Sequence, residues 1–364
     1  MTIFSTSIKN DAGGLQAHFL HVTSPAPREV WRDLLSSDPE AMPYQSPAWL
    51  DCICAVGGYS DVSRLYETAE GKKMVLPMVR TKGLPAPLTI EATLPHAWGI
   101  GGLVSSDPIE TDDVAAVFTD LAGRSVMRTS IRPNPRSGET WAAAQPAGVT
   151  AISRLAHVLD LDGGFDQVWS KRFKKTTRNR IRKAERSRLV VECDTTGKLV
   201  PVFYNLMQRS FDRWARQQRE PLALARFRAQ RRDPQRKFQI IARTLGEACR
   251  IWVAWLDGQP AAASIVLQYN NVNDARSAMD KELAAPVCAN DLLLKLSIED
   301  ACRAGCRYYH LGESGTSSGL AHYKSRFGAK PYPYAEYRLE RLPITYIDDR
   351  LRGIVKRLIG FKDA

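Results

Sequence analysis

The stretch from Tyr308 to Glu340 constrains the fold of this chain more than any other part of its 364 residues. Its sequence, YYHLGESGTSSGLAHYKSRFGAKPYPYAEYRLE, predicts a strand, a loop rich in glycine and serine, a short helix and a second strand. Lys324 stands on the predicted helix, shortly after the loop. A lysine fixed at such a junction can stabilise a developing negative charge, so Lys324 is a candidate catalytic residue.

The rest of the chain alternates between predicted helices and strands, which favours an α/β (α+β) fold. Ser46 followed by Pro47 is typical of a helix start, and Asp257 followed by Gly258 predicts a tight hairpin turn. One continuous helical stretch is expected from Phe165 to Arg188. We expect the other helices at 27–37, 46–58, 112–125, 199–246 and 290–304, and strands at 72–83, 125–135, 190–194, 250–256, 261–270, 275–280, 308–312 and 333–340. The range 94–104 predicts a glycine-rich turn that leads into a strand.

The chain is too long for one typical hydrophobic core, and its 44% of hydrophobic residues is enough to bury two. We therefore predict two domains, 1–160 and 161–340, although no internal sequence repeat is visible. The tail, 341–364, is basic and amphipathic. Its apolar residues have near-helical spacing and predict either packing on the first domain or contact with an anionic membrane: Ile347, Leu351, Ile354, Leu358 and Phe361.

The chain carries a large positive charge, with 51 Lys and Arg against 39 Asp and Glu and a formal net charge of +12. Such an excess indicates an anionic partner, which can be nucleic acid, a phosphate group or a membrane surface. The charge is concentrated between Lys171 and Arg188, where ten of eighteen residues are basic. Two further basic clusters begin at Arg213 and Arg226. The alternative interpretation of the first stretch is a merely solvated basic helix face.

The seven cysteines include no CxxC pair, and their odd number fits a reducing compartment. The N-terminal residues lack the charged and apolar regions of a signal peptide, and no run approaches the roughly 18 apolar residues of a membrane span. We therefore expect a cytoplasmic protein without integral membrane contact. No cluster has metal-ligand spacing, so we expect no metal.

Two strings together resemble a known family. ANDLLLKLSIEDACRAGCRYYHLGESGTSSGLAHYKSRFGAKP is similar to the C-terminal signature of the FemAB-like branch of the GNAT superfamily, and WSKRFKKTTRNRIRKAERSRLVVE is similar to its basic helix. The resemblance extends from about Gln45 to Tyr337 and is specific in the last 150 residues of that range. It implies two GNAT-like domains, each a mixed twisted sheet flanked by helices, and transfer of an acyl or aminoacyl group to an amine.

The donor in this family is an aminoacyl-tRNA in the nonribosomal peptidyltransferases and is thought to be an acyl-CoA in polysaccharide-modifying relatives. CoA-dependent GNAT enzymes usually carry R/Q-x-x-G-x-G/A, which cradles the pyrophosphate at a helix N-terminus. Arg243, Gly246 and Ala248 match these letters, but Gly246 is predicted to end a helix. Three basic clusters fit tRNA better than they fit one pyrophosphate. We therefore expect no bound cofactor, with aminoacyl-tRNA as co-substrate and acyl-CoA as the alternative.

The resemblance also suggests roles for individual residues. Tyr323 and Lys324 match the family's aromatic–lysine pair, in which relatives often have Phe, and Lys324 would stabilise the oxyanion or the adjacent terminal phosphate. Asp280 and Glu313 are candidates for orienting or deprotonating the acceptor amine. We predict substrate contacts from Ser314, Ser317, Arg276, His310 and Trp98, and tRNA contacts from Lys171, Arg172, Lys174, Lys175, Arg178, Arg180, Arg182 and Lys183.

Three hypotheses follow from the sequence. The first is an aminoacyl-tRNA-dependent aminoacyltransferase that forms an amide or peptide bond on a cell-wall precursor or a natural-product amine. The second is an acyl-CoA-dependent N-acyltransferase acting on a sugar or small-molecule amine. The third, a noncatalytic RNA-binding protein, is the least consistent with an intact Lys324 loop and helix.

Overall fold

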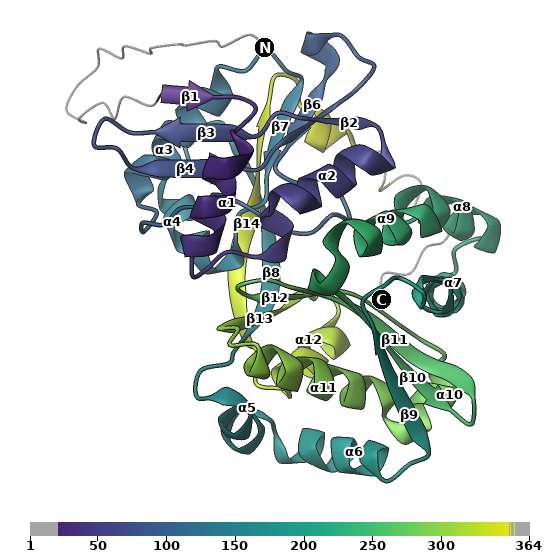
Figure 1. Cartoon of the computed structure of the whole chain (residues 1–364). Coiled ribbons are helices and arrows are strands. Elements are labelled where there is room, and N and C mark those ends of the chain that lie inside the picture. Colours follow the sequence, from purple (N-terminus) through teal and green to yellow (C-terminus); the bar gives the residue numbers. More distant parts are fainter. Residues whose placement is uncertain (1–20, 349, 351–352, 354–364) are drawn as a thin grey trace. The chain divides into compact units, whose positions relative to one another are not determined.

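The computed structural model describes residues 21–348, 350 and 353 (Figure 1). These residues form two compact units, one of residues 21–155 and 332–342 and one of residues 156–331 with the described part of 343–353. The chain passes from one unit to the other within β8 (Thr150–Asp160) and within β14 (Lys330–Glu340). Most of the predicted amphipathic tail, including Leu351, Ile354, Leu358 and Phe361, lies outside the described residues, so its packing stays a prediction.

The first unit contains five neighbouring strands in the order β2-β5-β6-β7-β14. β6 and β7 are parallel and the other neighbours are antiparallel, with α3 in the connection between the parallel pair. A small antiparallel sheet has the order β1-β3-β4. The bounds are β1 His21–Thr23, α1 Arg28–Ser37, α2 Pro47–Val56, β2 Tyr59–Asp61, β3 Arg64–Glu67, β4 Lys73–Leu76, β5 Val79–Thr81, β6 Ile90–Ala92, α3 Thr111–Ala122, β7 Arg128–Ile131 and α4 Gly138–Ala143.

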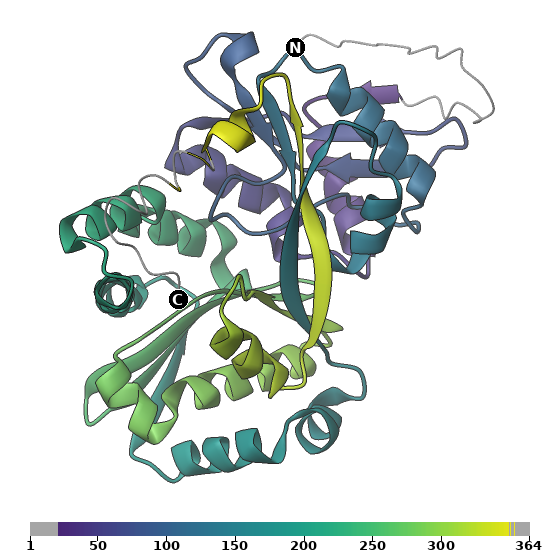
Figure 2. The ribbon, with the colours of Figure 1, turned by 180° about the vertical axis from the view of Figure 1, so that it is seen from behind.

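The second unit has the strand order β8-β13-β12-β11-β10-β9. β12 and β13 are parallel, and the other neighbours are antiparallel. α7 and α9 cover one face of this sheet, and α11 covers the other with α6 beyond it (Figures 1 and 2). The bounds are α5 Gly164–Gln167, α6 Lys175–Glu185, β9 Leu189–Asp194, α7 Val200–Gln217, α8 Leu222–Arg232, α9 Gln235–Leu245, β10 Cys249–Leu256, β11 Gln259–Gln268, β12 Val272–Met279, α10 Lys281–Val287, α11 Ala289–Arg303, β13 Tyr308–Glu313 and α12 Ser318–Ser325.

The two units share one strand plan. In each, a parallel pair, β6–β7 or β12–β13, whose connection contains helix, lies between antiparallel neighbours on both sides. This confirms the predicted α/β architecture of two similar mixed sheets flanked by helices. The units are similar although the sequence shows no repeat, because a strand plan needs only the periodicity of apolar residues.

The parallel pair of the second unit is short. β12 and β13 pair at only two positions, Val272 with Tyr309 and Asn273 with His310. β12 then continues to Met279, while β13 pairs with β8 through a bulge between His310 and Glu313. Beyond Asn273 and His310 the backbones of β12 and β13 therefore no longer pair with each other. This separation lies where β13 leads into the loop before α12.

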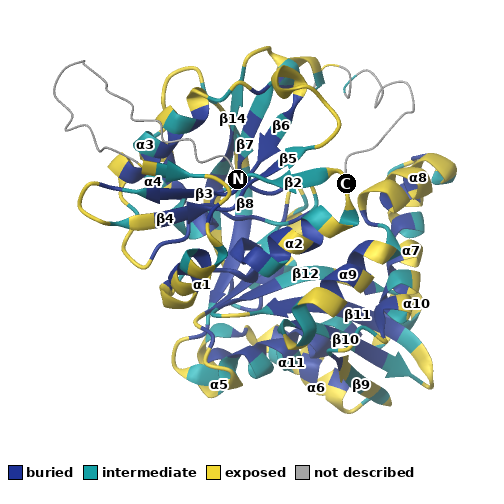
Figure 3. Ribbon diagram, turned by 45° about the horizontal axis from the view of Figure 1, so that its top comes forward, coloured by how far each residue is buried: buried dark blue, intermediate teal, exposed yellow. Residues whose placement is uncertain are grey.

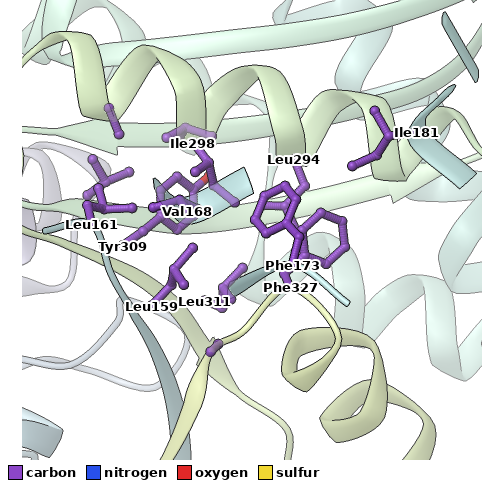
Figure 4. Close-up of a cluster of buried hydrophobic side chains, with 14 of the residues drawn as sticks. Leu159, Leu161, Val168, Phe173, Ile181, Leu294, Ile298, Tyr309, Leu311 and Phe327 are labelled. Atoms are coloured by element: carbon purple, nitrogen blue, oxygen red, sulfur yellow. The ribbon is translucent and has the colours of Figure 1, made fainter. Parts of the chain in front are cut away.

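The core of the second unit joins α6, α11, α12 and the sheet (Figure 4). Apolar residues between Phe165 and Ala184 pack here, and Phe173 contacts Phe327 with ring centroids 5.1 Å apart. Leu294 and Ile298 of α11 contribute to the same cluster. Apolar burial of this kind is the dominant favourable term in folding. Here it fixes the basic segment, residues 171–188, against α12.

A buried ion cluster lies in the first unit. Glu336 of β14 accepts hydrogen bonds from Arg132 at 2.9 Å, Arg154 at 2.6 Å and Arg338 at 2.8 Å. Its side chain is 4% exposed. Burial alone would raise the pKa of this carboxyl, but the charges and hydrogen bonds of the arginines lower it to about 2.

Several predicted elements differ from the structure. The stretch 165–188 is not one helix: a π-type turn at Val168–Arg172 follows α5, and the chain is extended at Phe173 before α6 begins. The Arg178 guanidinium donates to the carbonyl groups of Trp169, Ser170 and Phe173, which stabilises this break. The region 199–246 forms three helices, and 72–83 forms two strands in different sheets on either side of Pro77. Within 94–104, which the structure describes completely, only an isolated bridge from Val104 to Val75 forms.

Candidate functional site

Lys324 lies where β13 leads through the loop into α12. Lys324 is 5% exposed, and its Nζ donates to the carbonyl oxygen of Gly312 at 2.9 Å and to that of Glu313 at 2.7 Å. An ammonium has three donors, and no third partner is found for this one among the described residues. Burial lowers the pKa of Lys324 to about 8, while the carboxylates of Asp274 and Glu313 act in the opposite direction. Lys324 is therefore mostly protonated at neutral pH.

The loop before α12 positions Lys324 through glycines and serine caps. Gly312 and Gly315 have positive φ values of 71° and 54°, a conformation that glycine adopts without the strain of a Cβ. Ser317 caps α12 by accepting the amide of Leu320 at 3.3 Å. Ser314 is 4% exposed, and its hydroxyl has no hydrogen-bond partner within the described part of the chain. A buried hydroxyl without a partner is costly, so Ser314 fits the predicted role of contacting a substrate.

Two titratable groups that the sequence did not single out lie near Lys324. Asp274 follows the two paired positions of β12, and Ser277 donates to it at 3.1 Å. Burial raises the pKa of Asp274 to about 6, against the effect of the Lys324 charge. His157 on β8 is 2% exposed, and burial together with the Lys324 charge lowers its pKa. The site therefore combines a lysine, a carboxyl and an imidazole whose pKa values are all shifted by burial, as in many catalytic sites.

Helix α12 is attached to the basic segment by backbone and side-chain hydrogen bonds. The carbonyl of Arg326 accepts from the Lys174 amide at 2.9 Å and from the Thr177 hydroxyl at 2.8 Å. Asp291, at the start of α11, pairs with Arg326 and with Arg180, the latter at 3.1 Å. These contacts fix the start of α6 next to the helix that carries Lys324.

The eight predicted tRNA-binding residues divide into two groups. Arg178 and Arg180 serve internal contacts, as described above, and Arg172 donates to the Asp160 carbonyl and lies 3.7 Å from its carboxylate. Arg182 is exposed and stacks over Trp169 at 5.9 Å from the ring centroid. The remaining four are exposed and have no ion-pair partner among the described residues: Lys171, Lys174, Lys175 and Lys183. Part of this charge therefore stabilises the fold, and the remainder faces solvent.

The two further basic clusters, on α7 and α8, are partly neutralised by ion pairs. Arg213 donates to the Met279 carbonyl at 3.1 Å. Arg226, Arg228 and Arg232 pair with Asp212, Glu220 and Asp233 at 2.6, 3.0 and 2.9 Å. They contribute less to a continuous positive surface than their number in the sequence implied.

Three other predicted site residues make contacts elsewhere in the structure. Asp280 caps α10 through the amides of Glu282 and Leu283 and pairs with Arg209 at 2.8 Å. Arg276 pairs with Asp233 at 2.9 Å, and Trp98 belongs to the first unit, where its carbonyl accepts the Trp49 indole at 3.0 Å.

Three predicted residues lie on or next to the Lys324 helix and loop. Glu313 holds Lys324 through its carbonyl. His310 is buried on β13, opposite Asn273. The Tyr323 hydroxyl donates to the Asn290 carbonyl at 3.3 Å, and its ring lies under Arg326 at 4.8 Å from the guanidinium carbon.

The matched CoA motif does not form a phosphate loop. Gly246 ends α9 with φ 53°, and β10 follows three residues later, as the sequence predicted. In the second unit the helix that follows the parallel strand β12 is α10, and its first amides are used by Asp280. No glycine occurs from Asp280 to Asn290. This stretch therefore lacks the open, glycine-lined amides with which a helix N-terminus approaches a pyrophosphate.

Comparisons with known proteins agree with this geometry. Residues 171–325, from the basic segment through Lys324, match the family described as acetyltransferase (GNAT) domain. No curated protein sequence matches the chain. The fold resembles the crystal structure of FemX, with a TM-score of 0.63 and 11% identity over 90% of this chain and 98% of FemX. It also resembles the C-terminal domain of a putative lysylphosphatidylglycerol synthetase from Agrobacterium fabrum, with a TM-score of 0.51 and 15% identity over 90% and 95% of the two chains.

The parallel strand pair and the domain match over 171–325 agree with a GNAT-type fold. Residues 171–325 match the GNAT domain family, and the two-unit fold of the chain is similar to that of FemX. No helix among the described residues has both the length and the apolar character needed to cross a membrane.

Proposed function

We propose that the protein is an aminoacyltransferase that moves an aminoacyl group from aminoacyl-tRNA to an amine acceptor. The observation that carries this proposal is the attachment of the basic segment to the Lys324 helix through Arg326, Thr177 and Asp291. In this proposal a polyanion binds along the exposed lysines of 171–183, and its end reaches the buried Lys324 ammonium. The absence of a glycine-lined pyrophosphate cradle in 280–290 makes acyl-CoA the weaker donor.

The reaction needs no covalent enzyme intermediate. The acceptor nitrogen attacks the ester carbonyl carbon of the aminoacyl-tRNA, and a C–N bond forms as the carbonyl oxygen becomes an oxyanion. The intermediate collapses with cleavage of the bond to the ribose oxygen, which leaves with the proton given up by the amine. The third donor of Lys324 stabilises the oxyanion or the terminal phosphate, and neutral His157 or the Asp274 carboxylate accepts the amine proton.

The first experiment is transfer from pooled cellular aminoacyl-tRNAs, each amino acid labelled in turn, in the presence of a metabolite extract. Matched samples contain RNase or acetyl-CoA. We expect RNase-sensitive transfer of one amino acid to an amine. Transfer that survives RNase and requires acetyl-CoA would instead identify an N-acyltransferase.

The basic segment gives a testable salt dependence. Lys175 and Lys183 are exposed and serve no internal contact that the structure describes, so Lys175→Glu with Lys183→Glu removes charge without breaking the fold. The slope of log affinity for tRNA against log salt is expected to fall by about 0.8 for each phosphate that a lysine no longer neutralises, or by about 1.6 for the pair. Filter binding at several salt concentrations measures it. Lys281→Glu, at an exposed lysine of α10, is the control, and an unchanged slope in the double variant removes α6 from the donor site.

Asp274 is expected to set the alkaline limit of activity. Its charge raises the pKa of Lys324, which burial lowers to about 8. In Asp274→Asn that support is lost, the pKa of Lys324 falls further, and the protonated form disappears at lower pH. The rate of single-turnover transfer between pH 6 and 9 should therefore decline at lower pH than in the wild type. Ser277→Ala, which keeps the carboxyl, should leave the decline near pH 8. Coincident profiles for wild type and Asp274→Asn would refute the coupling.

A further inference from the structure

Helix α8 places its small residues inside and its large apolar residues outside. Ala225 and Ala229 are 9% and 7% exposed, whereas Leu224 is 37% and Phe227 is 62% exposed. Leu224, Phe227 and Arg231 are spaced i, i+3 and i+7, so they share the face that points away from the unit. Figure 3 shows exposed residues along α8. An ordinary surface helix has the opposite arrangement, with its large apolar residues in the core.

The surroundings of this face are basic and aromatic. α7 packs against α8 and carries Trp214, which is 40% exposed. Between residues 213 and 236 the chain is rich in arginine and has only two acidic residues, Glu220 and Asp233. Arg216 and Arg231 are exposed and form no ion pair within the described residues. Exposed Trp, Phe and Leu combined with arginine are the composition of helices that lie in a membrane interface.

We propose that α8, together with Trp214, docks on an anionic lipid surface. Phe227 and Leu224 enter the boundary between headgroups and acyl chains, and Arg216 and Arg231 contact lipid phosphates. This contact is peripheral, in agreement with the absence of a membrane-spanning helix among the described residues. It does not depend on the identity of the acyl donor.

Other occupants fit the surface less well. Residues 350–363 of this chain carry five basic residues and one acidic residue, so the tail has the same sign of charge as the patch, as does a second copy of the chain. Nucleic acid is favoured by open positive charge and stacking rings. Here Arg226, Arg228 and Arg232 are held in ion pairs, and Leu224 has no ring to stack.

Co-sedimentation of the full chain with vesicles tests the proposal. We expect binding to vesicles of phosphatidylcholine with phosphatidylglycerol, weakened by salt, and little binding to phosphatidylcholine alone. Phe227→Ser should lower the partition coefficient about tenfold, because the buried ring is lost from the apolar phase. Val190→Ser, at a residue of β9 that is 66% exposed, is the matched control and should bind as the wild type does.

Three results would overturn the proposal: no vesicle binding, equal binding to neutral and anionic vesicles, or equal binding of Phe227→Ser and wild type. Parallel measurements of tRNA binding test nucleic acid as the alternative partner of this surface. If Phe227→Ser weakens tRNA binding and leaves vesicle binding unchanged, the surface belongs to nucleic acid. The aminoacyl-transfer assay is independent of these readouts, so failure of lipid binding leaves the proposed reaction unaffected.

Discussion

Lys324→Met is expected to lower the rate of aminoacyl transfer at least about 100-fold, because one removed oxyanion donor typically costs about 3 kcal/mol of barrier. Methionine keeps the approximate volume of the side chain but removes the charge that the carbonyl groups of Gly312 and Glu313 hold in place. Single-turnover rates with preformed aminoacyl-tRNA measure the effect on the chemical step. The donor affinity should change much less, since the exposed lysines of 171–183 bind the polyanion.

Two further variants make this prediction specific. Lys330→Met, at an exposed lysine six residues later, should transfer at the wild-type rate. Lys324→Arg keeps a charge that does not titrate below about pH 12, so any residual activity should lose its decline near pH 8. A folded Lys324→Met protein with wild-type single-turnover rates would exclude Lys324 from the chemistry.

Glu336→Gln is expected to lower the free energy of unfolding by about 3 kcal/mol at pH 7. The pKa of Glu336 is lowered from 4.5 to about 2, and each unit corresponds to about 1.4 kcal/mol. Removing the carboxylate also leaves Arg132, Arg154 and Arg338 gathered without their shared anion, which is costly in a buried site. Urea unfolding followed by circular dichroism at pH 7 measures the loss.

The pH dependence of the same variant tests the cause. Because the folded-state pKa is depressed, the stabilisation by Glu336 is complete above pH 4.5 and is lost as the pH falls from 4.5 towards 2. The stability difference between wild type and variant should therefore narrow in acid. Glu29→Gln, at an exposed glutamate of α1, is the control. A constant difference from pH 7 to pH 3 would show that the loss arises from packing and not from charge.

The sequence allowed the prediction of the elements around Lys324, because each local signal agreed with the others. The strand at 308, the serine caps and glycines of the loop, and the helix before Phe327 all formed as expected. The turn at Asp257 and Gly258 also formed, with both residues at positive φ. The break at Phe173 could not be predicted, because it depends on carbonyl groups that Arg178 satisfies from the next helix and on a contact with Phe327, which is distant in the sequence.

The candidate site was predicted only in part, because some of its residues are brought together from distant parts of the sequence. Lys324 and Ser314 carry local signals, but Asp274 and His157 lie on separate strands, and only strand pairing brings them to one place. Asp274 directly precedes the strand predicted at 275–280, and this position was the one available sequence signal for it. Asp280 has an equally suggestive position at a strand end, yet its carboxylate caps α10 and pairs with Arg209.

The close contact between the basic segment and the end of α12 limits how this protein can be re-engineered. Gly328 follows α12, and a Cβ at its position would lie 2.6 Å from the Arg172 carbonyl oxygen. The basic segment and the turn after α12 therefore form one matched pair of surfaces. A chimera that exchanges residues 165–185 for those of a relative should fold only if residues 318–329 are exchanged with them.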